Sequence, residues 1–237
     1  NMMKDFRFLI FSISLFILVA LLSCSKGDMS ANGQKIPNGN VAFVSVVHAA
    51  PQTGSLQFAF NDNRVNIDVF NFTDRVNYLN AFSGQRRFAA FLKGSSDTLV
   101  AKNITLQQNK NYTVFITDIP GKTDAVLVRD SSRAPGADSV RIRFANMSPD
   151  LGSLDLYVGG SSTPLATNIA FKTAGDFISV RAANNVTLEV SRSGSKDAFL
   201  QLKGINLVSG NYYTVWSTGL GSLPNSEAKS RLTIFWH

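Results

Sequence analysis

The amino-acid sequence predicts an all-β protein that carries two tandem β-sandwich domains behind an exported N-terminal segment. Three observations support this prediction: a single cysteine directly after an apolar run, an internal duplication of the remaining chain, and apolar residues that alternate with a period of two. The first observation concerns the anchoring of the chain. The other two concern its fold class.

Residues 1–23 have the layout of a bacterial lipoprotein signal peptide. Lys4 and Arg7 give a positive start, and the apolar run 8–22 ends in Leu-Leu, with Ser23 directly before Cys24. A run of this length is short for a membrane crossing, which needs about 20 residues, and it is typical of a cleaved export signal. Cys24 is the only cysteine, so the junction indicates lipidation, with a free thiol as the alternative. We expect acyl chains on Cys24 to hold the mature protein in the membrane.

Residues 24–40 predict a tether between the lipidated cysteine and the first domain. The segment is polar, rich in Gly and Asn, and has no apolar periodicity. Ser25 stands where an aspartate retains many lipoproteins in the inner membrane, which favours the outer membrane. Lys26 with Asp28 weakly resembles the charged signals that send some lipoproteins to the cell surface.

The rest of the chain is an internal duplication. The opening VAFVSVVHAAPQTGSLQFAF at 41–60 aligns with SVRIRFANMSPDLGSLDLYV at 139–158, and the ending ITLQQNKNYTVFITD at 104–118 aligns with INLVSGNYYTVWSTG at 205–219. The copies span 41–130 and 139–237, each about the size of one immunoglobulin-like domain. Residues 131–138, with a central Pro-Gly pair, form the linker, and we expect each copy to close its own core.

Within each copy, the apolar residues alternate as they do in half-buried strands. Runs of this kind end at Gly, Asn, Asp, Ser or Pro every eight to twelve residues, which is typical of a sandwich. Alternation directs every second side chain inward. It therefore places these aromatic residues in the cores: Phe58, Phe60, Tyr157, Phe199 and Tyr213.

The second copy resembles domain-of-unknown-function family 4397, whose tandem sandwich domains occur in exported bacterial proteins and lipoproteins. The resemblance rests on Arg143, Asn146, Ser148-Pro149-Asp150, an Asp-hydrophobic-Tyr strand at 155–157, and Tyr-Thr-Val at 213–215. The first copy matches loosely, with His-Ala-Ala-Pro at its corresponding turn. The resemblance implies fold and export, and it carries no catalytic residues.

Composition argues against most chemistry. The chain has a net charge of +7 without a clustered basic stripe, which excludes a nucleic-acid footprint. It has two histidines, His48 and His237, too few for a typical zinc site or a Ser-His-Asp triad. We interpret His48 as a turn-capping or surface group and expect His48→Ala to fold normally. The oxygen-rich residues 61–63 with Asp68 fit no EF-hand loop and predict a hairpin turn. No metal and no cofactor is expected.

The leading functional hypothesis is a non-catalytic, lipid-anchored envelope or surface protein with a binding, adhesion or structural role. Its ligand would be a glycan or a protein. One alternative is an accessory glycan-binding lipoprotein, for which Trp216 and Trp236 are the candidate ligand contacts, although either tryptophan could instead fill the second core. The other alternative is a hydrolase that uses two carboxylates, which the sequence does not pair.

Overall fold

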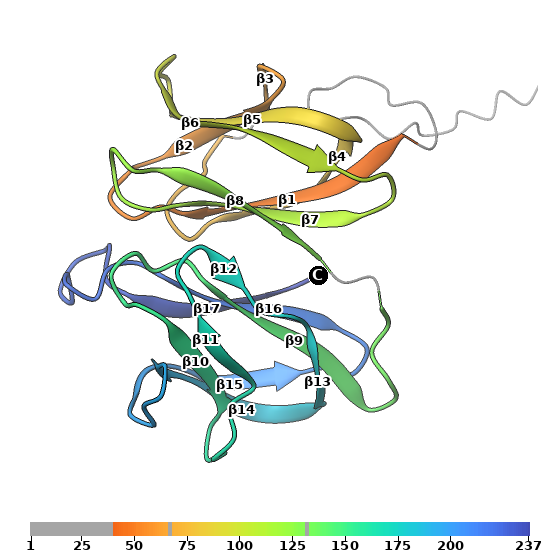
Figure 1. Ribbon diagram of the computed structural model, residues 1–237, viewed down its shortest axis with the longest axis vertical. Coiled ribbons are helices and arrows are strands. Elements are labelled where there is room, and N and C mark those ends of the chain that lie inside the picture. Colours follow the sequence, from red (N-terminus) through yellow and green to blue (C-terminus); the bar gives the residue numbers. More distant parts are fainter. Residues whose placement is uncertain (1–39, 66–67, 131–132) are drawn as a thin grey trace, which may run out of the picture.

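A computed structural model describes residues 40–65, 68–130 and 133–237, and these residues form strands, turns and loops without a helix (Figure 1). None of them therefore forms a helix long and apolar enough to cross a membrane. The predicted signal peptide, Cys24 and nearly all of the tether lie outside the described residues. The strands are β1 (Val41–Ala49), β2 (Leu56–Phe60), β3 (Asn63–Arg64), β4 (Arg75–Phe82), β5 (Gly84–Leu92), β6 (Thr98–Leu106), β7 (Asn111–Thr117), β8 (Asp124–Arg129), β9 (Ser139–Asn146), β10 (Leu154–Val158), β11 (Ala166–Ile169), β12 (Thr173–Ala174), β13 (Ile178–Arg181), β14 (Ala183–Arg192), β15 (Ala198–Leu207), β16 (Tyr212–Thr218) and β17 (Arg231–Trp236).

The strands build four sheets, which confirms the all-β sandwich prediction. Sheets β3-β2-β5-β6 and β4-β1-β7-β8 enclose the first core, and sheets β12-β9-β16-β17 and β11-β10-β14-β15 enclose the second. Strand β13 continues the pairing of β12 along β9. Figure 1 shows the two sandwiches stacked, with β8 leading toward the second sandwich.

The two sandwiches repeat one topology. In each copy the first strand pairs in parallel with a late strand, β1 with β7 and β9 with β16, and the late strand pairs in antiparallel with the last one. A matching tyrosine stands at the start of each late strand. The hydroxyl of Tyr112 accepts the backbone N–H of Gln107 at 3.1 Å, and that of Tyr213 accepts the backbone N–H of Val208 at 3.0 Å. The duplication in the sequence thus extends to hydrogen-bond detail.

Three of the five aromatic residues predicted for the cores lie there, and two do not. Phe58, Phe60 and Tyr213 are at most 6 % exposed. Tyr157 is half-buried and Phe199 is 40 % exposed. Their strand neighbours Leu156, Val158 and Leu200 pack in the second core, so alternation turns both aromatic side chains to the outer face of the sheet.

A third apolar core lies between the sandwiches, on the outer faces of β1 and β7 in one copy and of β9 and β16 in the other. Its fully buried members are Val47, Ala49, Phe115, Ala145, Met147 and Trp216. The rings of Phe115 and Trp216 lie 5.7 Å apart. These two residues occupy equivalent positions in the duplication, so the same face of each copy packs against its counterpart.

Two reciprocal hydrogen bonds show the same near-symmetry. Thr117 Oγ1 donates to the carbonyl of Met147 at 3.1 Å, and Thr218 Oγ1 donates to the carbonyl of Ala49 at 2.9 Å. Thr117 aligns with Thr218, and Ala49 aligns with Met147, so the interface resembles the isologous contact of a symmetric dimer. The expectation of two sandwiches that each close a separate core is therefore incomplete, because an isolated copy would expose this third core to water.

We expect Trp216→Ala to destabilise the whole chain by about 3–5 kcal/mol, because it opens a cavity in a fully packed interface. Chemical unfolding followed by circular dichroism measures this change. The matched control is Trp236→Ala: Trp236 is 66 % exposed, and its removal should change stability by less than about 0.5 kcal/mol. Equal effects of the two substitutions would contradict the interdomain core.

Candidate functional site

The most strongly buried charges of the described residues form an ion pair between the sandwiches. Arg143 on β9 pairs through Nη2 with Asp130, which directly follows β8, and both side chains are at most 2 % exposed. Thr113 Oγ1, at 3.0 Å, and the hydroxyl of Tyr78 both donate to Oδ2 of Asp130, whereas Arg143 pairs with Oδ1. Burial and the adjacent Asp130 carboxylate raise the pKa of Tyr78, so its proton stays on the ring oxygen.

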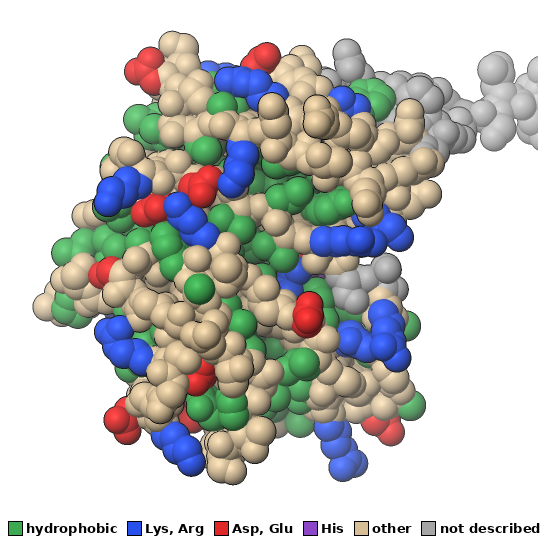
Figure 2. Space-filling view, viewed as in Figure 1, with side chains coloured by type: hydrophobic (Ala, Val, Ile, Leu, Met, Phe, Trp, Pro, Cys, Tyr) green, Lys and Arg blue, Asp and Glu red, His purple; other side chains and the backbone are tan. Residues whose placement is uncertain are grey.

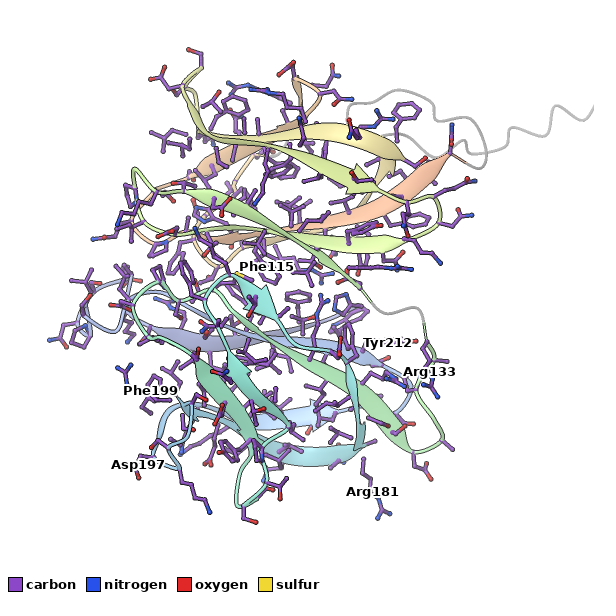
Figure 3. The ribbon with its side chains drawn as sticks, in the orientation of Figure 1. Phe115, Arg133, Arg181, Asp197, Phe199 and Tyr212 are labelled. Atoms are coloured by element: carbon purple, nitrogen blue, oxygen red, sulfur yellow. The ribbon has the colours of Figure 1, made fainter. Side chains whose placement is uncertain are left out.

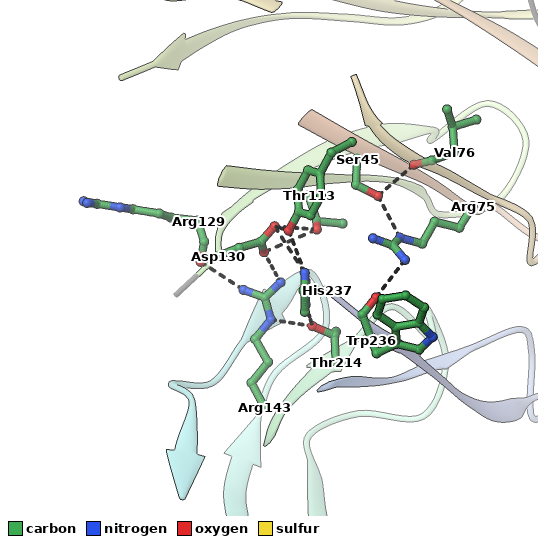
Figure 4. Close-up of polar contacts among 11 residues, drawn as sticks. Ser45, Arg75, Val76, Thr113, Arg129, Asp130, Arg143, Thr214, Trp236 and His237 are labelled. Carbon is green, nitrogen blue, oxygen red and sulfur yellow. Dashed lines mark hydrogen bonds and ion pairs between the residues drawn. The ribbon is translucent and has the colours of Figure 1, made fainter. Parts of the chain in front are cut away.

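His237 closes this cluster into a ring of hydrogen bonds (Figure 4). Its Nδ1 lies 2.6 Å from the hydroxyl of Tyr78 and its Nε2 lies 2.7 Å from Thr214 Oγ1, which accepts Nε–H of Arg143 at 2.9 Å. Burial lowers the pKa of His237 to about 4 against the opposing field of Asp130, so the imidazole is neutral at pH 7. A neutral ring that donates from Nδ1 and accepts at Nε2 satisfies every member of the cycle.

This ring joins the domains. Its tyrosine, histidine, aspartate and arginine are the residue types of proton-transfer sites, but each polar group already has a partner, and a general base works best with a pKa near the working pH. Two further arginine contacts cross the interface. Arg143 Nη1 donates to the carbonyl of Arg129 at 2.9 Å, and Arg75 Nη1 donates to the equivalent carbonyl, that of Trp236, at 3.0 Å.

His48 is a turn cap, as one of the two sequence interpretations held, but it is fully buried rather than exposed. Its Nε2 lies 2.8 Å from the carbonyl of Gly54, and its Nδ1 accepts the backbone N–H of Ala50 at 3.3 Å. Burial lowers its pKa, so the ring is neutral and carries its proton on Nε2. In the second copy Asn146 makes the same two bonds, to Gly152 at 2.8 Å and from Ser148 at 3.1 Å. The imidazole of His48 thus makes, in the first copy, the hydrogen bonds that the side-chain amide of Asn146 makes in the second.

An open hollow of about 780 Å³ lies beside the exposed Phe199 ring, at the end of the second sandwich opposite the linker. The guanidinium of Arg192 lies 5.6 Å from the centre of that ring. Arg192 is itself held in place, because its Nη1 donates to the carbonyl of Leu151 at 2.7 Å. Figure 3 shows Phe199 and Asp197 together at this edge of the molecule. The other polar lining comes from Asp150, Ser195, Ser222 and Ser230.

Asp150 positions the loop that forms the far wall of this hollow. Its two carboxylate oxygens accept the backbone N–H groups of Gly221, at 2.8 Å, and Ser222, at 2.9 Å. Partial burial by itself would raise the pKa of Asp150, but these hydrogen bonds outweigh it and lower the pKa. The loop also depends on Gly219, which has φ +81° and would place a Cβ 2.1 Å from the carbonyl oxygen of Lys229. Only glycine fits there.

A second hollow of about 450 Å³ adjoins the first one. The two share Asp150 and Ser222, and the second is also lined by Gln52, Asp118 and Lys122 of the first sandwich. We call the two adjoining hollows the Phe199 trough, and the loop held by Asp150 lines both of them.

The two tryptophans named as candidate ligand contacts have different positions. Trp216 is 2 % exposed in the interdomain core, so it fills a core, although not the core of the second sandwich. Trp236 is 66 % exposed and lines none of the hollows described above. Phe199 is the aromatic residue that lies beside polar groups in the hollow of about 780 Å³, and the sequence signal for it was its place near the Ser-Gly-Ser turn.

The oxygen-rich turn at 61–63 is a hairpin. Asn61 and Asp62 both have positive φ, and Asp62 forms an ion pair with Arg87. Over the part of the chain that the structure describes, no group of three or more His, Cys, Asp and Glu residues is placed to hold a metal ion.

The model of one protein family matches the chain twice, over residues 42–157 and 142–230. The chain belongs to the family named domain of unknown function (DUF4397). The duplicated sandwiches of this DUF4397 chain are thus two copies of a family domain, as the resemblance predicted. No curated protein matches the chain.

Two solved structures illustrate what this DUF4397 chain is similar to. One is a structure described as alpha-glucan binding by a streptococcal virulence factor. It is 12% identical to this chain, the match covers 76% of this chain and 92% of that chain, and the TM-score is 0.25. The other is a family 26 carbohydrate-binding module of Eubacterium rectale in complex with maltoheptaose, with 10% identity, coverage of 81% and 96%, and a TM-score of 0.25. Likeness at this level supports no inference about ligand.

We expect His48→Asn to retain nearly full stability, because Asn146 makes the same two turn bonds in the second copy. His48→Ala should cost about 1–3 kcal/mol, since the carbonyl of Gly54 and the N–H of Ala50 would then lack their buried partner. Thermal unfolding of both variants tests this. A result in which Ala and Asn are tolerated equally would contradict the turn-cap role and restore the expectation that His48→Ala folds normally.

Proposed function

We propose that this chain is a lipid-anchored binding protein of the bacterial cell envelope that holds a carbohydrate without transforming it. The observation that carries this proposal is the Phe199 ring, 40 % exposed at the edge of a polar hollow and flanked by Arg192. A sugar presents apolar C–H faces to an aromatic ring and hydroxyl groups to polar neighbours, so this combination suits a saccharide.

The surroundings of Phe199 support binding by a pre-organised surface. Arg192 is held by the carbonyl of Leu151, and the loop opposite is held by Asp150, so neither wall needs to be ordered when a ligand arrives. The adjoining hollow adds polar lining from the first sandwich next to the loop held by Asp150.

A hydrolytic role fits the same hollow less well. Asp150 and Asp197 both line it, as a two-carboxylate mechanism would require. The general acid of such a pair needs a raised pKa, whereas the pKa of Asp150 is lowered by the backbone groups that it holds. The Asp150 carboxylate is thus already occupied by the backbone N–H groups of the loop, and we favour binding without turnover.

Anchoring by Cys24 places this surface close to the membrane. The support is the sequence pattern of residues 1–23 and the polar tether, which together favour the outer membrane and the cell surface. A lipid anchor with a binding trough suits a protein that collects or adheres to envelope or environmental glycans.

Phe199→Ala should weaken binding to a neutral oligosaccharide about tenfold, because it removes the stacking face and leaves the polar walls in place. Titration calorimetry with malto-, xylo- and gluco-oligosaccharides measures the affinity, and an assay for new reducing ends measures turnover. The matched control is Val208→Ala, which removes an apolar side chain that is 56 % exposed and outside the hollow. Unchanged affinity in Phe199→Ala, or new reducing ends in the wild-type reaction, would refute this function.

Cys24→Ser should abolish incorporation of labelled fatty acid and leave unprocessed precursor, because a serine hydroxyl does not form the thioether. Labelling in cells followed by electrophoresis tests this independently of any ligand. Mature-sized, membrane-bound protein from the variant would exclude the lipoprotein assignment.

A further inference from the structure

A third hollow, of about 520 Å³, lies at the junction of the two sandwiches beside the linker. Its walls are the end of β8, the start of β9 and the segment 174–177. In Figure 2 the blue side chains gather at the right-hand edge, at the level where the sandwiches meet. Figure 3 places Arg133 at this edge and Phe199 at the opposite one, so the hollow is separate from the Phe199 trough.

The lining of this hollow is rich in arginine. Arg129, Arg133, Arg141 and Arg143 face one exposed carboxylate, Asp176, and the buried Asp130. The charge of Asp130 is already matched by Arg143. Neither Arg129 nor Arg141 forms an ion pair with any carboxylate of the described residues. The hollow therefore has an excess of positive charge.

Arg141 presents an unused donor. Its Nη1 donates to the carbonyl of Phe177 at 3.0 Å, and its Nε is buried without a hydrogen-bond partner. No described residue accepts from Nη2. Because Nε is buried, a ligand in the hollow reaches the guanidinium through Nη2, a charge-assisted donor for a carboxylate oxygen.

An aromatic wall stands next to this donor edge. Phe177 lines the hollow, packs edge-on against Tyr212 with centroids 6.0 Å apart, and lies beneath the Arg143 guanidinium at 4.6 Å. Its position is thus fixed from two sides. A ligand with an anionic group on an apolar ring face would meet both Arg141 and Phe177.

We infer that this junction hollow binds the carboxylate of an acidic saccharide, with Nη2 of Arg141 as the charged donor and Phe177 as the apolar wall. A uronic acid carries a planar carboxylate on a ring with C–H faces, and it fits a hollow of this volume. The hollow is a second site that shares no lining residue with the Phe199 trough, so binding at one does not depend on binding at the other.

The test is titration calorimetry of the purified full chain in detergent with oligogalacturonate, and with the same oligomer after methyl esterification of its carboxylates. We expect binding of the acid and loss of binding of the ester. Arg141→Gln should weaken the binding of the acid about tenfold, because it removes a charge-assisted hydrogen bond.

Arg181→Gln is the matched control, since Arg181 is an exposed arginine of β13 that does not line the hollow (Figure 3). It should leave the affinity within about twofold. Phe199→Ala should leave oligogalacturonate binding unchanged even where it abolishes neutral oligosaccharide binding, which separates failure of this site from failure of the proposed function.

Three results would overturn the inference: equal affinity for the ester, equal affinity for polyglutamate, or equal loss in Arg141→Gln and Arg181→Gln. The circular dichroism melting curve shows whether Arg141→Gln is folded. If it is not, Arg129→Gln at the exposed rim replaces it. That variant should weaken binding about two- to fivefold through loss of one nearby charge, and unchanged affinity would refute the site.

Discussion

The buried pair of Asp130 and Arg143 is the contact on which the arrangement of the two sandwiches depends. Two charges removed from water are tolerated only when each is matched and hydrogen-bonded, and breaking such a pair by removing one partner costs about 3–5 kcal/mol. Here Tyr78, His237 and Thr214 complete the ring around the pair. A small rotation of one sandwich would leave several of these groups unsatisfied, so the ring selects one relative orientation.

That orientation creates the surfaces discussed above. The third apolar core lies between the copies, and the trough and the junction hollow each use residues of both sandwiches, such as Asp118 with Asp150 and Arg129 with Arg141. A domain taken alone would lack the residues that the other one contributes. Near-symmetry explains how a duplicated domain could bury the same face twice, since an isologous contact is complementary to itself.

The near-symmetry breaks where the polar ring forms. Arg143 aligns with Ser45, and Asp130 aligns with His237, so the charged pair exists at one of two equivalent places. At the other place Arg75, from a different strand, donates to both the hydroxyl of Ser45 and the carbonyl of Trp236. The two equivalent places thus carry two different arginine contacts, and both join the sandwiches.

The sequence by itself determined the all-β class, the duplicated sandwich topology and the core positions of Phe58 and Tyr213, because a period of two assigns each side chain to a face. The sequence also indicated the third core, because β1 is largely apolar on both faces, as is typical of a strand that is covered on both sides. Only the tertiary structure decided that Trp216 is buried and Phe199 exposed, and that Arg141 keeps an unused donor. Such facts depend on contacts between residues far apart in the chain, which alternation along one strand does not specify.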